Sequence, residues 1–274
     1  MSAANRNRAD SVGANERTIL ALGGHEFSRK RGNEAIRDYM LALADGPVPR
    51  VCLLPTASGD PAGQIAAFGA SLGDLRCRLS HVSLFRLESE PIDLARHLLA
   101  QDLIYVGGGS MVNLVAILRA HGLDEVLRLA WERGVVLAGQ SAGAMCWFEW
   151  GVTRSAGTAR LAPGLGFVHG VLSAHYHRDP ERRRVLLDVV ARRGWRGHGL
   201  DDGAGLLLRG DHVAAPVKGR EEADAWQVAP NGRGRARERR LDSASLPPPR
   251  PGIDEVGGDV VEMRRLRALR SALR

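Results

Sequence analysis

Hydrophobic positions in the first two thirds of the chain alternate between two patterns. Short continuous apolar runs, most of them followed by glycine or proline, are separated by segments whose apolar residues recur three or four positions apart. This alternation is typical of a mainly parallel sheet that is covered by helices on both faces. The predicted strands are 18–22, 51–54, 79–85, 103–106 and 135–138, and the predicted helices are 33–44, 64–72, 91–100, 112–120 and 123–133.

The pattern is less regular in the last third. It predicts helices at 144–148 and 180–193, an extended segment at 172–177, a glycine-rich hairpin over 199–208 and short strands at 213–217 and 225–228. From residue 231 glycine, proline, arginine and aspartate dominate, which favours an irregular segment, although residues 259–273 carry apolar positions at helical spacing. We therefore expect a disordered segment at 1–16, one α/β domain at 17–230 and an irregular basic tail at 231–274 that includes a C-terminal helix.

Composition narrows the class of protein. With 44% hydrophobic and 25% charged residues, the 274-residue chain resembles an ordinary globular protein. No apolar stretch is long enough to span a bilayer, and the polar N-terminus lacks the apolar region of a secretory signal. The three cysteines, Cys52, Cys77 and Cys146, form neither a disulfide framework nor a metal-binding pair. We expect a cytoplasmic protein with no membrane partner and no metal site.

The formal net charge of +7 raises the question of nucleic-acid binding. Almost all of the basic residues are arginines, since Lys30 and Lys218 are the two lysines. Only 5% of the residues are aromatic, so few side chains could stack on bases. No nucleic-acid-binding motif accompanies the charge, and we predict no nucleic-acid partner.

One serine stands in the context of a nucleophile. The predicted strand ending at Ala138 is followed by Gly139-Gln140-Ser141-Ala142-Gly143 and then by a helical segment. A serine on a tight turn between strand and helix needs small neighbours, and the helix that follows directs backbone N–H groups toward its oxygen. The alternative is a glycine-rich turn that only connects two elements. The context favours Ser141 as a nucleophile.

A glycine triplet adds to this pattern. Gly107-Gly108-Gly109 ends the strand that precedes the serine strand, so both loops should open at the same edge of a parallel sheet. The amides of Gly109 and Ala142 could then form an oxyanion hole. A phosphate-binding P-loop is excluded because no Gly-Lys-Ser/Thr follows the triplet.

The best candidate for a general base is His175. It follows an extended segment and lies 34 positions after Ser141. In such a segment His177 would point to the opposite side, and His169 is a weaker rival.

These motifs together resemble the peptidase E family of aspartyl dipeptidases, to which cyanophycinase is related. The resemblance rests on the ordered set of the glycine triplet, the Gly-x-Ser-Ala-Gly-Ala elbow and Ala174-His175-Tyr176, and it covers roughly residues 18–208. It implies a three-layer α/β/α fold like that of class I glutamine amidotransferases, with no metal or organic cofactor. It also implies that Ser141 attacks the peptide carbonyl, that His175 takes its proton and that Gly109 and Ala142 hold the oxyanion.

The third member of the triad is not given by the resemblance. Where many relatives have Thr-Asp-Ser after the elbow helix, this chain has Thr153-Arg154-Ser155. A carboxylate must still orient the imidazole. Glu149 is our first candidate, and Asp201 and Asp202 come second.

The substrate implied by the resemblance is a short peptide, such as a dipeptide with an N-terminal aspartate. Its carboxylate needs a cation, for which Arg178 is a candidate, and Ser110 follows the glycine triplet where relatives often have asparagine or aspartate. Two other functions stay open: an esterase that uses the same serine, and an amidotransferase-like binding or regulatory module that has lost turnover. An α/β-hydrolase esterase usually has its histidine much later in the chain, and a glutaminase would need cysteine at position 141. The sequence leaves a homodimer open.

Overall fold

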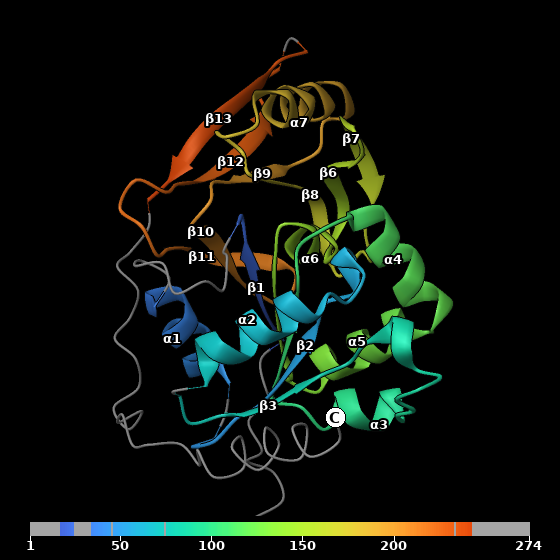
Figure 1. Ribbon diagram of the computed structural model, residues 1–274. Coiled ribbons are helices and arrows are strands. Elements are labelled where there is room, and N and C mark those ends of the chain that lie inside the picture. Colours follow the sequence, from blue (N-terminus) through green and yellow to red (C-terminus); the bar gives the residue numbers. More distant parts are fainter. Residues whose placement is uncertain (1–16, 25–33, 45, 74, 233, 243–274) are drawn as a thin grey trace, which may run out of the picture.

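A seven-stranded sheet forms the centre of the larger part of the molecule (Figure 1). The computed structural model describes residues 17–24, 34–44, 46–73, 75–232 and 234–242. The strand order is β11-β10-β1-β5-β4-β2-β3. Strands β1 to β5 run parallel to one another, whereas β10 pairs antiparallel with both β1 and β11. The strands are β1 (Thr18–Leu22), β2 (Arg50–Leu54), β3 (Arg78–His81), β4 (Leu103–Val106), β5 (Val136–Gln140), β10 (Ala204–Arg209) and β11 (His212–Lys218).

Helices cover both faces of this sheet, as the continuous apolar strands predict (Figure 1). One face packs against α1 (Glu34–Leu43) and α2 (Ala62–Leu72), and the other against α3 (Leu94–Leu99), α4 (Met111–Ala120) and α5 (Leu123–Glu132). Successive residues of β1 alternate between the two cores, because side chains along a strand point to opposite faces. Leu20 and Leu22 join the α1–α2 side, while Ile19 and Ala21 join the other. The three-layer α/β/α prediction is confirmed.

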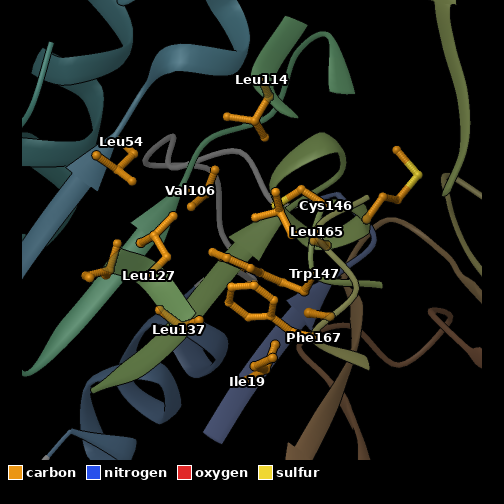
Figure 2. Packing of buried hydrophobic residues seen from close by; sticks show 14 of the residues in the cluster. Ile19, Leu54, Val106, Leu114, Leu127, Leu137, Cys146, Trp147, Leu165 and Phe167 are labelled. Atoms are coloured by element: carbon orange, nitrogen blue, oxygen red, sulfur yellow. The ribbon is translucent and has the colours of Figure 1, made fainter. Parts of the chain in front are cut away.

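Two aromatic side chains anchor the segment that follows the serine turn. Trp147 lies just after the short helix α6 (Ala142–Met145) and is completely buried. Its ring lies 5.6 Å, centroid to centroid, from that of Phe167, and both rings pack beside Ile19 and Leu137 of the sheet (Figure 2). Fully burying side chains of this size contributes about 1.5–3 kcal/mol each. The serine turn is thereby fixed to the main core.

A second, six-stranded sheet follows α6. Its order is β13-β12-β9-β8-β6-β7, and β6, β8 and β9 are its parallel members. Helix α7 (Pro180–Arg193) covers it, with Leu186 and Val190 packed against Val152 and Val171 (Figure 1). The strands are β6 (Phe148–Ala156), β7 (Thr158–Pro163), β8 (Val168–Ala174), β9 (Gly197–Leu200), β12 (Ala225–Pro230) and β13 (Ala236–Leu241).

Several local expectations from the sequence are wrong. The helix expected at 144–148 is the shorter α6, because the chain turns into β6 at Phe148 to start the second sheet. The strand expected at 79–85 ends at His81, and residues 84–86 form a 3₁₀ turn. The expected hairpin does not form, since β9 and β10 belong to different sheets.

The predicted boundary at residue 230 also needs correction. Residues 236–241, expected to be irregular, form β13, which pairs along its length with β12. The strand was obscured because the four consecutive residues 237–240 are all charged, including the inward Glu238. The segments predicted to be disordered at 1–16 and helical at 259–273 lie outside the described residues.

Within the described ranges, no helix combines the length and apolar character needed to cross a bilayer. In the same ranges, no group of three or more histidine, cysteine, aspartate and glutamate side chains could hold a metal ion.

Close backbone packing brings the glycine triplet against the serine turn. A Cβ atom added to Gly143 would lie 2.1 Å from the carbonyl oxygen of Val106 and 2.8 Å from that of Gly107. A Cβ atom added to Gly139 would lie 2.3 Å from the carbonyl oxygen of Gly143. Only residues without a side chain allow β4, β5 and α6 to approach this closely.

We expect Gly143→Ala to lower the free energy of unfolding by about 1–3 kcal/mol, the usual cost of forcing extra atoms into a packed site. Denaturant titration followed by circular dichroism measures this. Gly69→Ala is the matched control, because a Cβ atom at Gly69 in α2 meets nothing within 4 Å. Alanine there should stabilise the helix by about 0.5–1 kcal/mol. Equal effects of the two substitutions would contradict the packing argument.

Candidate active site

Ser141 lies at the C-terminal end of β5 in a strained backbone conformation. Its φ of 51° and ψ of −111° place it in a region that residues with side chains rarely adopt, at a cost of order 1–3 kcal/mol. The conformation is held on both sides: its amide donates to the carbonyl of Leu22 at 2.9 Å, and its carbonyl accepts from the amide of Met145 at 2.9 Å. The turn directs the serine side chain away from the strand, as a nucleophile elbow requires.

His175 reaches Ser141 from the second sheet. It follows β8 directly, and its Nε2 atom lies 2.9 Å from Oγ of Ser141. Its φ of 55° is also left-handed. The surrounding backbone holds this turn, since the carbonyl of His175 accepts from the amide of Asp179 at 2.9 Å and the amide of Tyr176 donates to Leu200 at 3.0 Å.

Asp202 is the third member of a hydrogen-bonded line of side chains that also contains Ser141 and His175. Its Oδ1 atom forms a short hydrogen bond with Nδ1 of His175, and its Oδ2 atom accepts from Nη1 of Arg178 at 3.1 Å. The hydrogen bond with His175 lowers the pKa of Asp202 to about 2, against the effect of its partial burial, and Arg178 lowers it further. An ionised Asp202 assigns the proton of a neutral His175 to Nδ1, which leaves Nε2 free to accept from the serine hydroxyl.

The end of β1 makes room for this pair. A Cβ atom on Gly24 would lie 2.2 Å from Oδ1 of Asp202 and 2.9 Å from Cε1 of His175. Backbone hydrogen bonds fix the contact, from Gly203 to Gly24 at 2.8 Å and from Gly23 to Ala204 at 2.9 Å. Sequence reasoning did not assign Gly24 to the site. The signal was the Gly-Gly pair that ends the first strand, at the same sheet edge as Ser141.

Glu149 does not occupy the position that we expected. It lies on β6, where its carboxylate accepts from Nδ1 of His169 at 2.9 Å and from the amide of Gly170 at 2.9 Å. The Gly170 amide and His169 lower the pKa of this carboxyl. Because β6 and β8 are neighbours in the second sheet, Glu149 meets the weaker rival His169 rather than His175. The expectation that Glu149 contacts His175 is wrong, and the contact is made by Asp202, one of the two second choices.

Asp201, the other second choice, binds a different histidine. Its Oδ1 atom accepts from the amide of His177 at 3.0 Å and lies 2.9 Å from Nδ1 of that ring. Its other oxygen accepts from Nε1 of Trp226 at 3.4 Å. His177 accordingly faces Trp226, with ring centroids 4.8 Å apart, and takes no part in the contact with Ser141.

Arg154 makes its ion pairs away from Ser141, His175 and Asp202. Its guanidinium pairs with Asp179 at 2.6 Å and with Glu181, both at the start of α7. The charge that replaces the aspartate of many relatives is therefore neutralised within the second sheet and its helix.

The glycine triplet approaches the elbow as the sequence predicts. Gly109 has a φ of 148°, and a Cβ atom there would lie 2.2 Å from the carbonyl oxygen of Ala57. Over the described ranges, the Gly109 amide has no backbone acceptor outside the helices and strands, and the Ala142 amide is the first of α6. Their assignment to an oxyanion hole stays a prediction.

Two residues expected to bind substrate have structural partners. The Ser110 side chain caps α4 by accepting from the amide of Asn113 at 3.3 Å. Arg178 contacts Asp202 while 79% of its side chain remains exposed. The role of both residues in binding substrate also stays a prediction.

Comparisons with known proteins identify the family of this chain. The sequence profile of peptidase family S51 matches residues 19–215. The chain is 41% identical over 211 residues to a Bacillus subtilis (strain 168) protein described as the uncharacterized peptidase YgaJ, covering 77% of this chain and 91% of that protein.

Solved structures support the fold. A peptidase from an acI-B1 Actinobacterium superposes with a TM-score of 0.64 at 20% identity, over 84% of this chain and 96% of the other. A peptidase E candidate from Listeria monocytogenes EGD-e gives 0.54 at 17% identity, over 72% and 96%. At these sequence identities the two structures are evidence for the fold alone. The matched profile spans most of the chain and includes Ser141, His175 and Asp202, and the protein belongs to peptidase family S51.

Proposed function

We propose that the protein is a serine peptidase that hydrolyses short peptides through an acyl-enzyme. One observation carries this proposal: His175 lies between Ser141 and Asp202, within hydrogen-bond distance of both. A serine, a histidine and a carboxylate in this order form the arrangement that activates a hydroxyl for nucleophilic attack.

The reaction would proceed in two halves. Oγ of Ser141 attacks the peptide carbonyl while its proton passes to Nε2 of His175. The imidazolium is stabilised by ionised Asp202 and then gives the proton to the leaving amine as the C–N bond breaks. A water molecule then attacks the ester on Ser141 while the same Nε2 atom takes its proton, and the imidazolium returns that proton to Oγ of Ser141 as the acid is released.

The negative charge of each tetrahedral intermediate needs hydrogen-bond donors. We assign these to the amides of Gly109 and Ala142, on the grounds that the glycine triplet packs against the elbow and that Ala142 directly follows the nucleophile. Removal of one such donor typically costs about 100- to 1,000-fold in kcat.

For the substrate we propose dipeptides with an N-terminal aspartate. Arg178 is well placed to read an acidic side chain, because it is highly exposed and lies within reach of Asp202. A guanidinium suits a carboxylate because it can donate two parallel hydrogen bonds. We further propose that the protein works in the cytoplasm without a cofactor.

Substitution of the nucleophile or base tests the mechanism. We expect Ser141→Ala and His175→Ala each to lower the rate of Asp-Leu hydrolysis by on the order of 10⁴-fold or more. Liquid chromatography of the released amino acids measures the rate. Hydrolysis that survives both substitutions would contradict the mechanism. Turnover of simple esters but of no peptide would favour an esterase, and binding of peptides without turnover would favour a regulatory module.

The identity of the acid is tested by a matched pair. Asp202→Asn keeps the shape of the side chain but removes the charge that orients His175, and we expect kcat to fall by on the order of 10⁴-fold. Glu149→Gln, in contrast, should leave kcat close to that of the unsubstituted protein, because Glu149 contacts His169 instead. A large loss with Glu149→Gln alone would reverse the assignment.

The role of Arg178 can be separated into binding and positioning. If it binds an acidic substrate, Arg178→Gln should raise KM for Asp-Leu by on the order of 10-fold while leaving Ala-Leu unaffected. An equal fall of kcat for both peptides would show instead that Arg178 acts through Asp202. Arg192→Gln is the control, since Arg192 is similarly exposed on α7 but pairs with Asp188 at 2.8 Å.

A further inference from the structure

The residue after the proposed base is connected to the far edge of the second sheet. Tyr176 is completely buried, and its ring packs over the backbone of β9, where a Cβ atom on Gly199 would lie 2.5 Å from the ring. The same core contains Leu186 and Val190 of α7. Since His175 itself adopts a left-handed conformation, its position depends on neighbours that hold the chain on either side.

The buried hydroxyl of Tyr176 is hydrogen-bonded to one carboxylate. It donates a short hydrogen bond to Oε1 of Glu238 on β13. Arg183 of α7 pairs with the same carboxylate through two nitrogens, one of them Nε at 2.9 Å from Oε1. Burial and the neighbouring Glu238 raise the pKa of Tyr176, so the phenol remains a proton donor. Burial works against ionisation of Glu238, but hydrogen bonds from Arg183 and Tyr176 hold its pKa below the usual value.

The register of β13 on β12 directs the side chain of Glu238 toward the interior. It lies opposite Val228 of β12, which is completely buried in the core that contains Tyr176. The neighbours of Glu238 on the strand, Arg237 and Arg239, are exposed. Only 15% of the Glu238 side chain is accessible. Its contact with Tyr176 is therefore built into the pairing of β13 with β12.

We propose that Glu238 is a positioning residue for the hydrolytic site, which it holds in place through Tyr176. This inference rests on the proposed serine peptidase function. Residue 238 lies beyond the 19–215 segment that matches the family model. An unpartnered Tyr176 hydroxyl would cost free energy in its buried site, and the turn that carries His175 would relax to relieve it. A shift of about 1 Å in a reacting group can cost on the order of 100-fold in rate.

The experiment compares four single variants of the full chain by the kcat and KM of Asp-Leu hydrolysis. Tyr176→Phe removes only the hydroxyl, and Glu238→Leu removes its acceptor. We expect both to lower kcat by on the order of 10-fold to 100-fold with little change in KM. Glu238→Gln keeps an acceptor oxygen for Tyr176 and should retain most of the activity. Arg237→Gln, on the exposed side of the same strand, should behave like the unsubstituted protein.

A second readout separates positioning from mere stability. Diisopropyl fluorophosphate phosphorylates an activated serine and releases fluoride, so its inactivation rate reports the Ser141–His175 pair without peptide binding. This rate should fall in parallel with kcat in Tyr176→Phe and Glu238→Leu. The double variant should be no slower than the slower single variant, because both act through one contact.

Two outcomes would overturn the inference. One is a Tyr176→Phe protein with unchanged kcat and inactivation rate, a result that decides the matter even if Glu238→Leu does not fold. The other is a Glu238→Leu protein with a lower Tm but full activity of the folded fraction. Failure of the unsubstituted protein to react with the organophosphate would instead refute the proposed function, so the two failures are distinguishable.

Discussion

The contact between the turn at Asp201–Gly203 and the end of β1 joins the two sheets at the proposed active site. The chain leaves the second sheet at Leu200 and enters the first at Ala204, and hydrogen bonds to Gly23 and Gly24 hold it at the crossing. Ser141 comes from the first sheet, His175 from the second and Asp202 from the crossing itself. The geometry of the three side chains therefore depends on how closely this turn approaches β1. The missing side chain of Gly24 makes that approach sterically feasible.

Residues with strained backbone conformations are concentrated at the proposed active site. Within the described ranges three residues other than glycine have positive φ, and two of them are Ser141 and His175. Such conformations persist only where the surroundings over-determine them. Leu22 and Leu200 accept hydrogen bonds from Ser141 and Tyr176, and the buried Trp147 and Tyr176 fix the chain just beyond each turn. The hydrogen-bond distance between Ser141 and His175 is thus set by packing before any substrate arrives, which agrees with the preorganisation that hydrolytic catalysis requires.

Local patterns in the sequence were sufficient to predict the parallel strands β1, β2, β4 and β5 of the first sheet, the helices that cover it and the pairing of Ser141 with His175. Apolar runs identified β1 to β5, and the glycines around Ser141 identified the turn. The acid could not be predicted in the same way, because chain position favoured Glu149 over Asp201 and Asp202. The choice depends on β6 running beside β8 in a separate sheet, which carries Glu149 toward His169. Strand β13 was likewise not predicted, because Arg237, Glu238 and Arg239 include no apolar residue. The inward position at the centre of the strand is occupied by the carboxylate of Glu238.

The arginines of β13 have a consequence for association. Among the described residues β13 is the last strand of its sheet, so its outer backbone N–H and C=O groups form an open edge. An edge of this kind can template the addition of a strand from another molecule, and natural proteins oppose this with charged side chains. Arg237, Arg239 and Arg240 are exposed along it. Part of the positive charge of this chain thereby opposes edge-to-edge aggregation, on the same strand whose inward carboxylate binds Tyr176.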